Sequence, residues 1–297
     1  MNTIEIKNIT KRYGNINALD HVSVSFDFGK IYGFLGRNGA GKSTLINLIA
    51  NRIFADEGII LVDGLPVEEN MEVHGKIFCM SEADLYDRDL KVKEHFAWAS
   101  RFYDSFESQK AHQIAEKFGL DIHKKFKALS KGYQSIFKLT MALSLNVPYV
   151  IFDEPVLGLD ANHRELFYEL LLKEYETNEK TIILATHLIE EVANIIEEVV
   201  LIDHGKILMQ ENVDTLLKSG YCVSGLAADV EAYCKDKQVM EIEELGSLKL
   251  AYILGERTAI PENSHLQISN INLQKLFVKL TEKGGQSDEK TDSCYSV

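Results

Sequence analysis

The sequence lacks any apolar run of the roughly 20 residues that a helix needs to cross a bilayer. Residues 1–5, Met-Asn-Thr-Ile-Glu, also lack the charged and apolar regions of a secretory signal. No internal repeat is visible, which argues against a solenoid or a tandem array. From these absences we expect a cytoplasmic protein without a membrane span of its own.

Basic residues are the minority among the charged ones, with 32 Lys and Arg against 45 Asp and Glu, and a net charge of −13. Because nucleic acids are bound through Lys and Arg, no nucleic-acid partner is expected. Cysteine is scarce too, and no pair has the C-x-x-C spacing of a zinc or redox site. Free thiols are therefore expected at Cys79, Cys222, Cys234 and Cys294.

A glycine-rich segment at 36–44 has the spelling G-x-x-x-x-G-K-[ST]. An apolar strand-like run, 31–35, precedes it, and a helix-like run, 45–50, follows it. Backbone amides and a helix N-terminus in such a loop bind phosphates. A chance glycine-rich turn is the alternative, and the strand–loop–helix context argues against it. The predicted nucleotide-binding residues are Gly36, Arg37, Asn38, Gly39, Ala40, Gly41, Lys42, Ser43 and Thr44, with Lys42 on the β- and γ-phosphates and Ser43 on Mg²⁺.

A second segment, Tyr149-Val150-Ile151-Phe152-Asp153-Glu154-Pro155, reads as a buried strand that ends in two carboxylates. Enzymes with a phosphate loop hold Mg²⁺ through such a strand-end carboxylate, the role predicted for Asp153. The side chain of the next residue, Glu154, is expected to point in a different direction from that of Asp153, and Glu154 is the predicted general base that polarises water. A strand that merely ends in an acidic turn is the alternative. The phosphate loop upstream argues against it.

A third segment, Leu129-Ser130-Lys131-Gly132-Tyr133-Gln134, suggests a helix that starts near Ser130 and offers a hydroxyl and amides to a γ-phosphate. Alone, Ser130 could equally be a simple helix cap. In the order 36–44, 129–134, 153–155, Gly158-Leu159-Asp160 and His187, however, the chain resembles the ATP-binding cassette (ABC) family. It departs from that family's usual LSGGQ segment at two positions but keeps the serine and a glycine.

The resemblance covers roughly the first 212 residues and is greatest to bacterial export cassettes of the YtrB kind. It implies an α/β fold, the P-loop NTPase fold of ABC ATPases, with an antiparallel β subdomain, a mostly parallel core sheet and a helical subdomain. The predicted domains are 1–212, with the helical subdomain at about 84–145, then a small C-terminal α/β domain at 213–283 and a disordered tail at 284–297. Helical periodicity from Val92 to about Phe118 places Phe96, Ala99, Phe102, Tyr103 and Phe106 near one face, mostly as core.

The resemblance also implies roles for single residues. Tyr13 matches the aromatic residue that stacks on adenine, with a buried strand-end tyrosine as the alternative. His187 matches the switch histidine on the γ-phosphate, and the other eight histidines are expected on the surface. Asp160 matches the loop aspartate at the dimer interface. Ser130 and Gly132 are then expected to complete the nucleotide site of a second cassette.

Position 82 departs from the family, because Glu82 stands where a glutamine is usual. A carboxylate oxygen ligates Mg²⁺ well, but its charge would repel the γ-phosphate if the metal were absent. We therefore expect a steeper dependence of ATP turnover on Mg²⁺. The alternative is that Glu82 is solvated and that another group takes the role.

With one phosphate loop and one signature segment, the chain is expected to need a second nucleotide-binding subunit, in a homodimer or a heterodimer. The resemblance implies an ATPase that uses ATP and Mg²⁺ and drives an exporter of peptides, antibiotics or related compounds. Separate transmembrane permease subunits would hold it peripherally at the inner face of the cell membrane.

Two alternatives differ in function. A soluble ABC ATPase acting on nucleic acid or the ribosome is disfavoured by the single cassette, the net charge of −13 and the absence of a zinc-containing or coiled-coil insertion between Lys42 and Ser130. A regulatory cassette without hydrolysis is disfavoured because Lys42, Asp153, Glu154 and His187 are all present.

Overall fold

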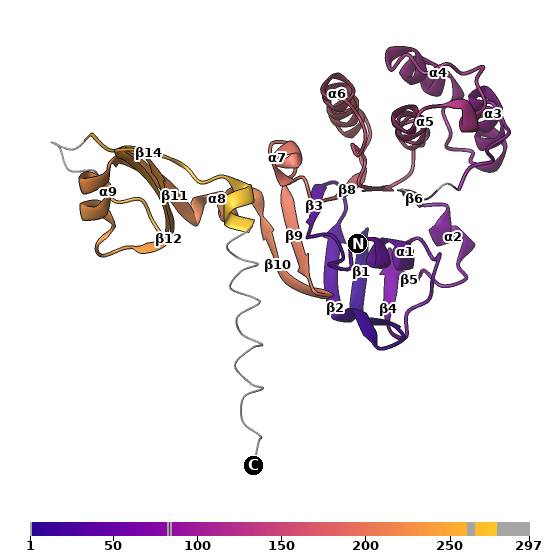
Figure 1. Ribbon diagram of the computed structural model, residues 1–297. Coiled ribbons are helices and arrows are strands. Elements are labelled where there is room, and N and C mark those ends of the chain that lie inside the picture. The colour runs from indigo at the N-terminus through magenta and orange to yellow at the C-terminus, as the bar shows by residue number, and fades with distance from the viewer. Residues whose placement is uncertain (1, 82, 84, 260–264, 278–297) are drawn as a thin grey trace. The chain divides into compact units, whose positions relative to one another are not determined.

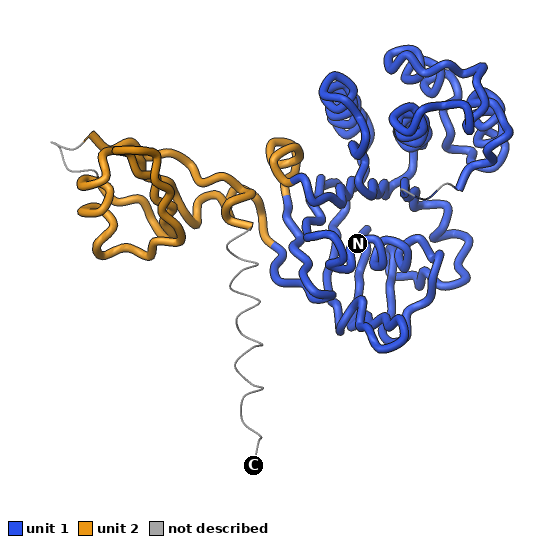
Figure 2. The backbone as a smooth tube through the Cα atoms, in the orientation of Figure 1, with its two compact units in different colours: residues 1–188, 198–210 blue, residues 189–197, 211–297 orange. Residues whose placement is uncertain are grey.

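A computed structural model describes the chain except residues 1, 82, 84, 260–264 and 278–297 (Figure 1). Its contacts divide the chain into two compact units (Figure 2). The first contains residues 1–188 and 198–210, and the second contains residues 189–197 and 211–297. Each unit is described by itself.

A six-stranded sheet, in the order β10-β9-β3-β8-β7-β6, forms the centre of the first unit. From β6 to β9 each neighbouring pair is parallel. The apolar runs of β3, β7 and β8 are buried throughout, as expected of strands covered on both faces. The buried strand predicted from Tyr149 is thus confirmed. The strands are β3 (Ile31–Leu35), β6 (Ile77–Met80), β7 (Tyr149–Asp153), β8 (Thr181–Thr186), β9 (Glu198–Asp203) and β10 (Lys206–Asn212).

An antiparallel sheet, β2-β1-β4-β5, forms a second layer of this unit. Its strands alternate apolar and polar residues, so that one face joins the core that also contains α1 (Lys42–Ile49). This confirms the predicted antiparallel subdomain. The strands are β1 (Thr3–Tyr13), β2 (Ile16–Asp27), β4 (Glu57–Val62) and β5 (Leu65–Pro66), and the short α2 (Met71–His74) follows them.

Helices dominate between β6 and β7 (Figure 1). The helix expected from 92 to about 118 is instead two helices. The backbone becomes extended at Tyr103, where the first helix ends, and Phe106 forms an antiparallel β-bridge with Leu145. The predicted apolar face is also wrong in part, since Phe102 is 72% and Tyr103 39% exposed. Phe102 lies six residues after the buried Phe96, about 120° around the helix. The helices are α3 (Val92–Phe102), α4 (Ser108–Lys117), η1 (Phe126–Ala128) and α5 (Lys131–Leu143), and α6 (Ala161–Thr177) follows β7.

The second unit contains an antiparallel sheet, β12-β13-β11-β14, with α9 packed on one face. Tyr221, Val223 and Ile253 from the sheet meet Val230 and Tyr233 from α9 in its core. The predicted tail at 284–297 lies outside the described residues. The elements are α7 (Ile189–Val192), α8 (Val213–Lys218), β11 (Gly220–Leu226), α9 (Ala227–Cys234), β12 (Gln238–Leu245), β13 (Leu248–Leu254) and β14 (Gln267–Asn270).

Among the residues that the structure describes, no helix has both the length and the apolar character required to span a membrane.

Candidate nucleotide-binding site

The glycine-rich segment forms the loop between β3 and α1, as predicted. Gly39 and Gly41 have φ values of 83° and 111°, which side chains other than glycine rarely adopt. A Cβ atom on Gly36 would lie 2.6 Å from the carbonyl oxygen of Ile202, so glycine is required there for space. The loop conformation therefore depends on glycine at three of its positions.

Lys42, the first residue of α1, turns its amine back over this loop. Its Nζ lies 2.7 Å from the carbonyl oxygen of Gly36 and 3.7 Å from Oε1 of Glu154. Burial lowers the pKa of Lys42, while the charges of Glu154 and Asp153 oppose that shift. The amine is thus held inside the phosphate loop next to two carboxylates.

Strand register brings the predicted acidic residues to the same edge of the sheet. Leu35 on β3 pairs with Thr186 on β8, and Asp153 on β7 pairs with Ala185. Asp153 is buried, and the N–H of Glu154 donates to the carbonyl of Ala185 at 2.9 Å. Glu154 has φ of 49°, an uncommon conformation for a residue other than glycine. The carboxyl ends of three adjacent parallel strands therefore meet beside the phosphate loop.

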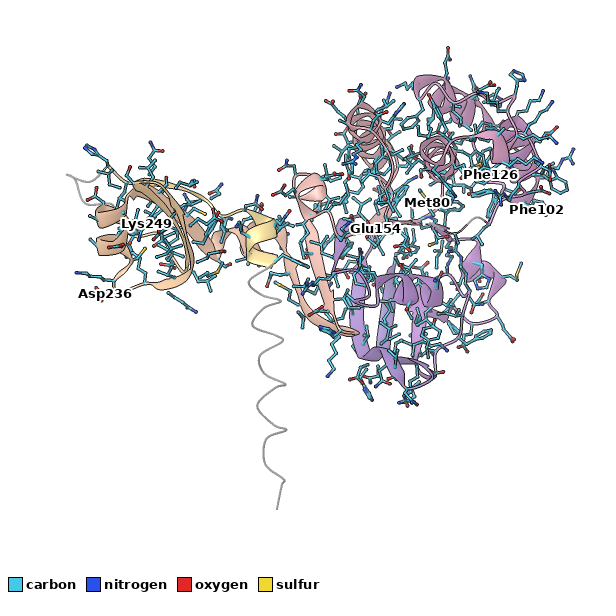
Figure 3. The ribbon with its side chains drawn as sticks, viewed as in Figure 1. Met80, Phe102, Phe126, Glu154, Asp236 and Lys249 are labelled. Carbon is cyan, nitrogen blue, oxygen red and sulfur yellow. The ribbon has the colours of Figure 1, made fainter. Side chains whose placement is uncertain are left out.

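Glu154, which is labelled in Figure 3, has a carboxylate that contacts His187, Thr186 and Lys42. Its Oε1 is 2.9 Å from Nδ1 of His187, and its Oε2 accepts a hydrogen bond from Oγ1 of Thr186 at 3.0 Å. Together with Lys42, these contacts unite a cation, a carboxylate and an imidazole from three elements. Such a set can bind a phosphate and move a proton from water.

The signature segment lies at the start of α5, whose N-cap is Ser130. Oγ of Ser130 accepts a hydrogen bond from the N–H of Tyr133 at 3.3 Å. A Cβ on Gly132 would come within 3.0 Å of the carbonyl oxygen of Gly158, so glycine permits a close approach of the two segments. The predicted cap and the predicted phosphate-binding role of Ser130 are compatible, since a hydroxyl has both donor and acceptor capacity.

Asp160 is the N-cap of α6. Its carboxylate accepts hydrogen bonds from the backbone N–H of His163 at 3.0 Å and from Nδ1 of the same residue at 2.8 Å. Both bonds lower the pKa of Asp160. Asp160 also shares a cavity of about 240 Å³ with the signature segment. That cavity is lined by Ser130, Gly132, Tyr133, Ile136, Gly158, Leu159, Asp160 and His163, and thus by none of the residues that surround Lys42.

Tyr13 ends β1 and is 51% exposed, which excludes the alternative of a buried strand-end tyrosine. Nζ of Lys11 lies 5.7 Å from the centre of its ring. An exposed ring with a cation over it is available for stacking on a base.

Two of the three predicted Mg²⁺ ligands lie within the described residues. Ser43 is the second residue of α1, and Asp153 ends β7, so they supply a hydroxyl and a carboxylate oxygen, which suit Mg²⁺. Among the described residues no group of three or more His, Cys, Asp or Glu side chains forms a metal cage. The third predicted ligand, Glu82, lies outside the described residues.

Lys138, which the sequence reasoning missed, is buried on α5. Its amine donates to the carbonyl oxygens of Ser81, at 3.3 Å, and Ala83, at 3.1 Å, on either side of position 82 in the sequence. The sequence signal for a buried, partnered lysine is its position within the largely apolar run 136–143, because a buried lysine is rare unless it is paired.

The expectation that the remaining histidines lie on the surface is wrong for His95, which is 7% exposed. Its ring packs against Tyr86, Phe126 and Phe137, and its Nε2 lies 3.0 Å from the carbonyl oxygen of Asp87. Burial lowers the pKa of His95. The predicted free thiols are confirmed for Cys79, Cys222 and Cys234, while Cys294 lies outside the described residues.

Comparison with known proteins supports the same family. The family model described as "ABC transporter" matches residues 19–157. The ABC transporter ATP-binding protein YtrB of Bacillus subtilis is 25% identical over 82% of this chain and 84% of its own length. An uncharacterized ABC transporter ATP-binding protein of Methanocaldococcus jannaschii, MJ1023, is 30% identical over 72% of this chain and 79% of its own length. Proteins named for Nod factor export and for ribose import also match.

A solved structure has the same fold. The dimeric structure of MJ0796, a bacterial ABC transporter cassette, superposes with a TM-score of 0.63 and 25% identity, over 71% of this chain and 98% of that one. The family and fold predicted from the motifs are confirmed, with the C-terminal unit built on an antiparallel sheet. The chain therefore belongs to the ABC transporter ATP-binding proteins and is an ATP-binding ABC-type ATPase cassette.

Proposed function

We propose that this cassette hydrolyses ATP to drive an exporter whose membrane-spanning permease subunits are separate chains. The observation that carries the proposal is the network of Lys42, Glu154 and His187 beside the phosphate loop. A cation, a carboxylate and an imidazole together at one edge of the central sheet support binding and cleavage of a phosphoanhydride.

In the proposed reaction the amides of the loop 36–41 and the amine of Lys42 bind the phosphates, and Tyr13 stacks on adenine. Ser43 and Asp153 would hold Mg²⁺, which neutralises charge on the phosphates. The water oxygen bonds to the γ-phosphorus as the bond from that phosphorus to the bridging oxygen breaks and ADP leaves, and Glu154 accepts a proton from the water. His187 contacts the γ-phosphate from the end of β8.

The second half of each site comes, in this proposal, from a second copy of the chain. The cavity of Ser130, Gly132 and Asp160 excludes Lys42 and Glu154 from its lining, so one copy offers two halves in separate places. Two copies would form two complete sites, with Ser130 and Gly132 of one copy against the ATP bound at Lys42 of the other. The similar cassette MJ0796 forms a dimer in its solved structure, which supports this arrangement.

An exposed aromatic surface on α3 supports docking of a permease. Trp98 and Phe102 are 47% and 72% exposed, and their rings stack with centres 5.6 Å apart. Tyr103, the residue after Phe102, is 39% exposed and lines a cavity of about 210 Å³ with Leu85 and Lys138. Grouped exposed apolar side chains mark interaction sites. Through this contact the cassette would lie at the inner face of the membrane.

The proposed direction of transport, export, rests on how much of the chain each relative matches. YtrB is similar over most of this chain, and a Nod factor export protein of Burkholderia lata is 27% identical over 94% of it. A ribose import protein matches with this chain covering only 46% of its length. The longer matches favour an exporter, and peptides, antibiotics or related compounds are the proposed cargo.

Co-purification from membranes tests the proposal. The chain is expressed with candidate permease subunits, and we expect a stable complex whose ATPase rate exceeds that of the chain alone. W98A combined with F102A should abolish the complex, whereas F54A should not, because Phe54 is 57% exposed and lies outside α3. Failure of the wild-type chain to retain any membrane subunit would contradict the proposal.

A further inference from the structure

We propose that Thr186 is a positioning residue for ATP hydrolysis, because its hydroxyl fixes both the carboxylate of Glu154 and the turn that presents His187. The inference rests on the proposed role of Glu154 as the general base. It adds a residue that neither the motifs nor the family comparison singles out.

The geometry of Thr186 is that of a hydrogen-bonding hub. It is the last residue of β8 and is 1% exposed. Its Oγ1 donates to Oε2 of Glu154 at 3.0 Å and accepts from the N–H of Leu188 at 3.0 Å. A hydroxyl can donate and accept at once, so one side chain satisfies both partners. The turn between Thr186 and Leu188, which carries His187, is thereby tied to the carboxylate.

This contact decides which carboxylate oxygen faces the phosphate loop. Oε1 of Glu154 lies 2.9 Å from Nδ1 of His187 and 3.7 Å from Nζ of Lys42, while Oε2 is taken by Thr186. The terminal torsion of a glutamate side chain is broad, so it is fixed mainly by its hydrogen bonds. Without the hydroxyl of Thr186, the carboxylate can rotate, and the partly buried backbone N–H of Leu188 loses its acceptor.

The backbone of Glu154 is held by the same strand. Its N–H donates to the carbonyl of Ala185 at 2.9 Å, and its φ of 49° is an uncommon conformation. The last two residues of β8 therefore fix both the backbone and the side chain of Glu154. A general base must lie within hydrogen-bond reach of the water it deprotonates, so small rotations reduce the rate while leaving ATP binding intact.

The same strand offers a matched control. Thr181 begins β8 and is fully buried. Its Oγ1 donates to the carbonyl of Asp27 at 3.2 Å and accepts from the N–H of Gly29 at 3.0 Å. The two threonines thus make the same kind of double contact at opposite ends of one strand, and only Thr186 contacts Glu154.

The experiment compares T186V, T186S and T181V by steady-state ATPase kinetics, by ATP affinity with a fluorescent nucleotide, and by melting temperature. We expect T186V to lower kcat at least about tenfold with KM and ATP affinity within about twofold of wild type. T186S, which restores the hydroxyl, should recover kcat to within about threefold. T181V should lower the melting temperature and leave kcat within about twofold of wild type. T186A serves in the same way if T186V does not fold.

Equal kcat in T186V and T181V, or no recovery in T186S, would overturn the inference. E154Q is measured in parallel to separate it from the proposed function. Loss of hydrolysis in E154Q with a normal kcat in T186V rejects only the role of Thr186. Wild-type hydrolysis in E154Q shows that Glu154 is not the base and rejects both.

Discussion

The phosphate-loop half and the signature half of this cassette are built on different physical principles. Around the phosphate loop, Lys42 and Asp153 are 5% and 7% exposed and lie with Glu154 in one network of opposite charges. In the signature half, Ser130 and Asp160 are helix N-caps at an exposed cavity.

This difference indicates that the two halves are suited to different roles in ATP hydrolysis. Buried charges hold a fixed geometry because each needs its partner, and they favour transition states that develop charge. The cavity at Ser130 offers a hydroxyl and the start of a helix, which can bind a phosphate presented from outside. The first half is thus suited to chemistry and the second to recognition.

Removal of the Lys42 amine should cause the largest loss of ATP binding and hydrolysis. K42M deletes the cation beside Glu154 and the proposed contact to the phosphates, so ATP affinity should fall about a hundredfold or more and hydrolysis should vanish. Equilibrium binding of a fluorescent nucleotide measures the first effect. K30M is the control, because Lys30 pairs with Glu198 at the opposite end of β3. Wild-type affinity in K42M would disprove the charge-network account.

Removal of the proposed metal ligand should have the next largest effect. D153N keeps the size of the side chain and deletes its charge, so the Mg²⁺ concentration that half-saturates ATP-dependent thermal stabilisation should rise at least about tenfold. Stabilisation by ATP in EDTA should not weaken, because a negative charge near the phosphates is lost. An unchanged Mg²⁺ requirement would contradict the role of Asp153.

Loss of the Tyr13 ring should have a smaller effect on the phosphate-loop half, because Tyr13 is proposed to stack on the adenine base of ATP. Stacking on an aromatic ring is worth about 1–3 kcal/mol per base, so Y13A should weaken ATP affinity about tenfold. Y13F keeps the ring and should bind like wild type. Titration calorimetry distinguishes the two variants, and equal affinities for Y13A and Y13F would argue against stacking.

The smallest effect concerns His95, in the helical segment that carries the signature. Its folded pKa is lowered by burial, so the unfolded chain takes up the proton first as pH falls. Stability is therefore retained above the unfolded value of about 6.5 and lost below it, by at most about 1.4 kcal/mol per pH unit. Urea unfolding at several pH values measures this slope. H95Q should flatten it, and an unchanged slope in H95Q would assign the effect to other groups.

The sequence allowed prediction of those parts of the site that are determined locally. The phosphate loop requires positive φ at Gly39 and Gly41, and a strand that ends in Asp153 is visible as an apolar run. Such features depend on a few consecutive residues, so the local sequence is sufficient to predict the local backbone conformation.

Features that depend on distant pairing could not be predicted. The helix break after Phe102 follows from the pairing of Phe106 with Leu145. The contact between Thr186 and Glu154 follows from the register of β7 against β8. Neither pairing has a signal within its own segment, because register is set by how the strands and helices pack together.

Mixing two inactive variants tests most directly the claim that one chain supplies halves of two sites. K42M keeps the signature half, and S130F keeps the phosphate-loop half but fills the cavity that Ser130 lines. We predict that neither hydrolyses ATP alone, that S130F binds ATP like wild type, and that the mixture hydrolyses ATP because mixed dimers contain one complete site. A mixture as inactive as its components, or hydrolysis by S130F alone, would contradict the account.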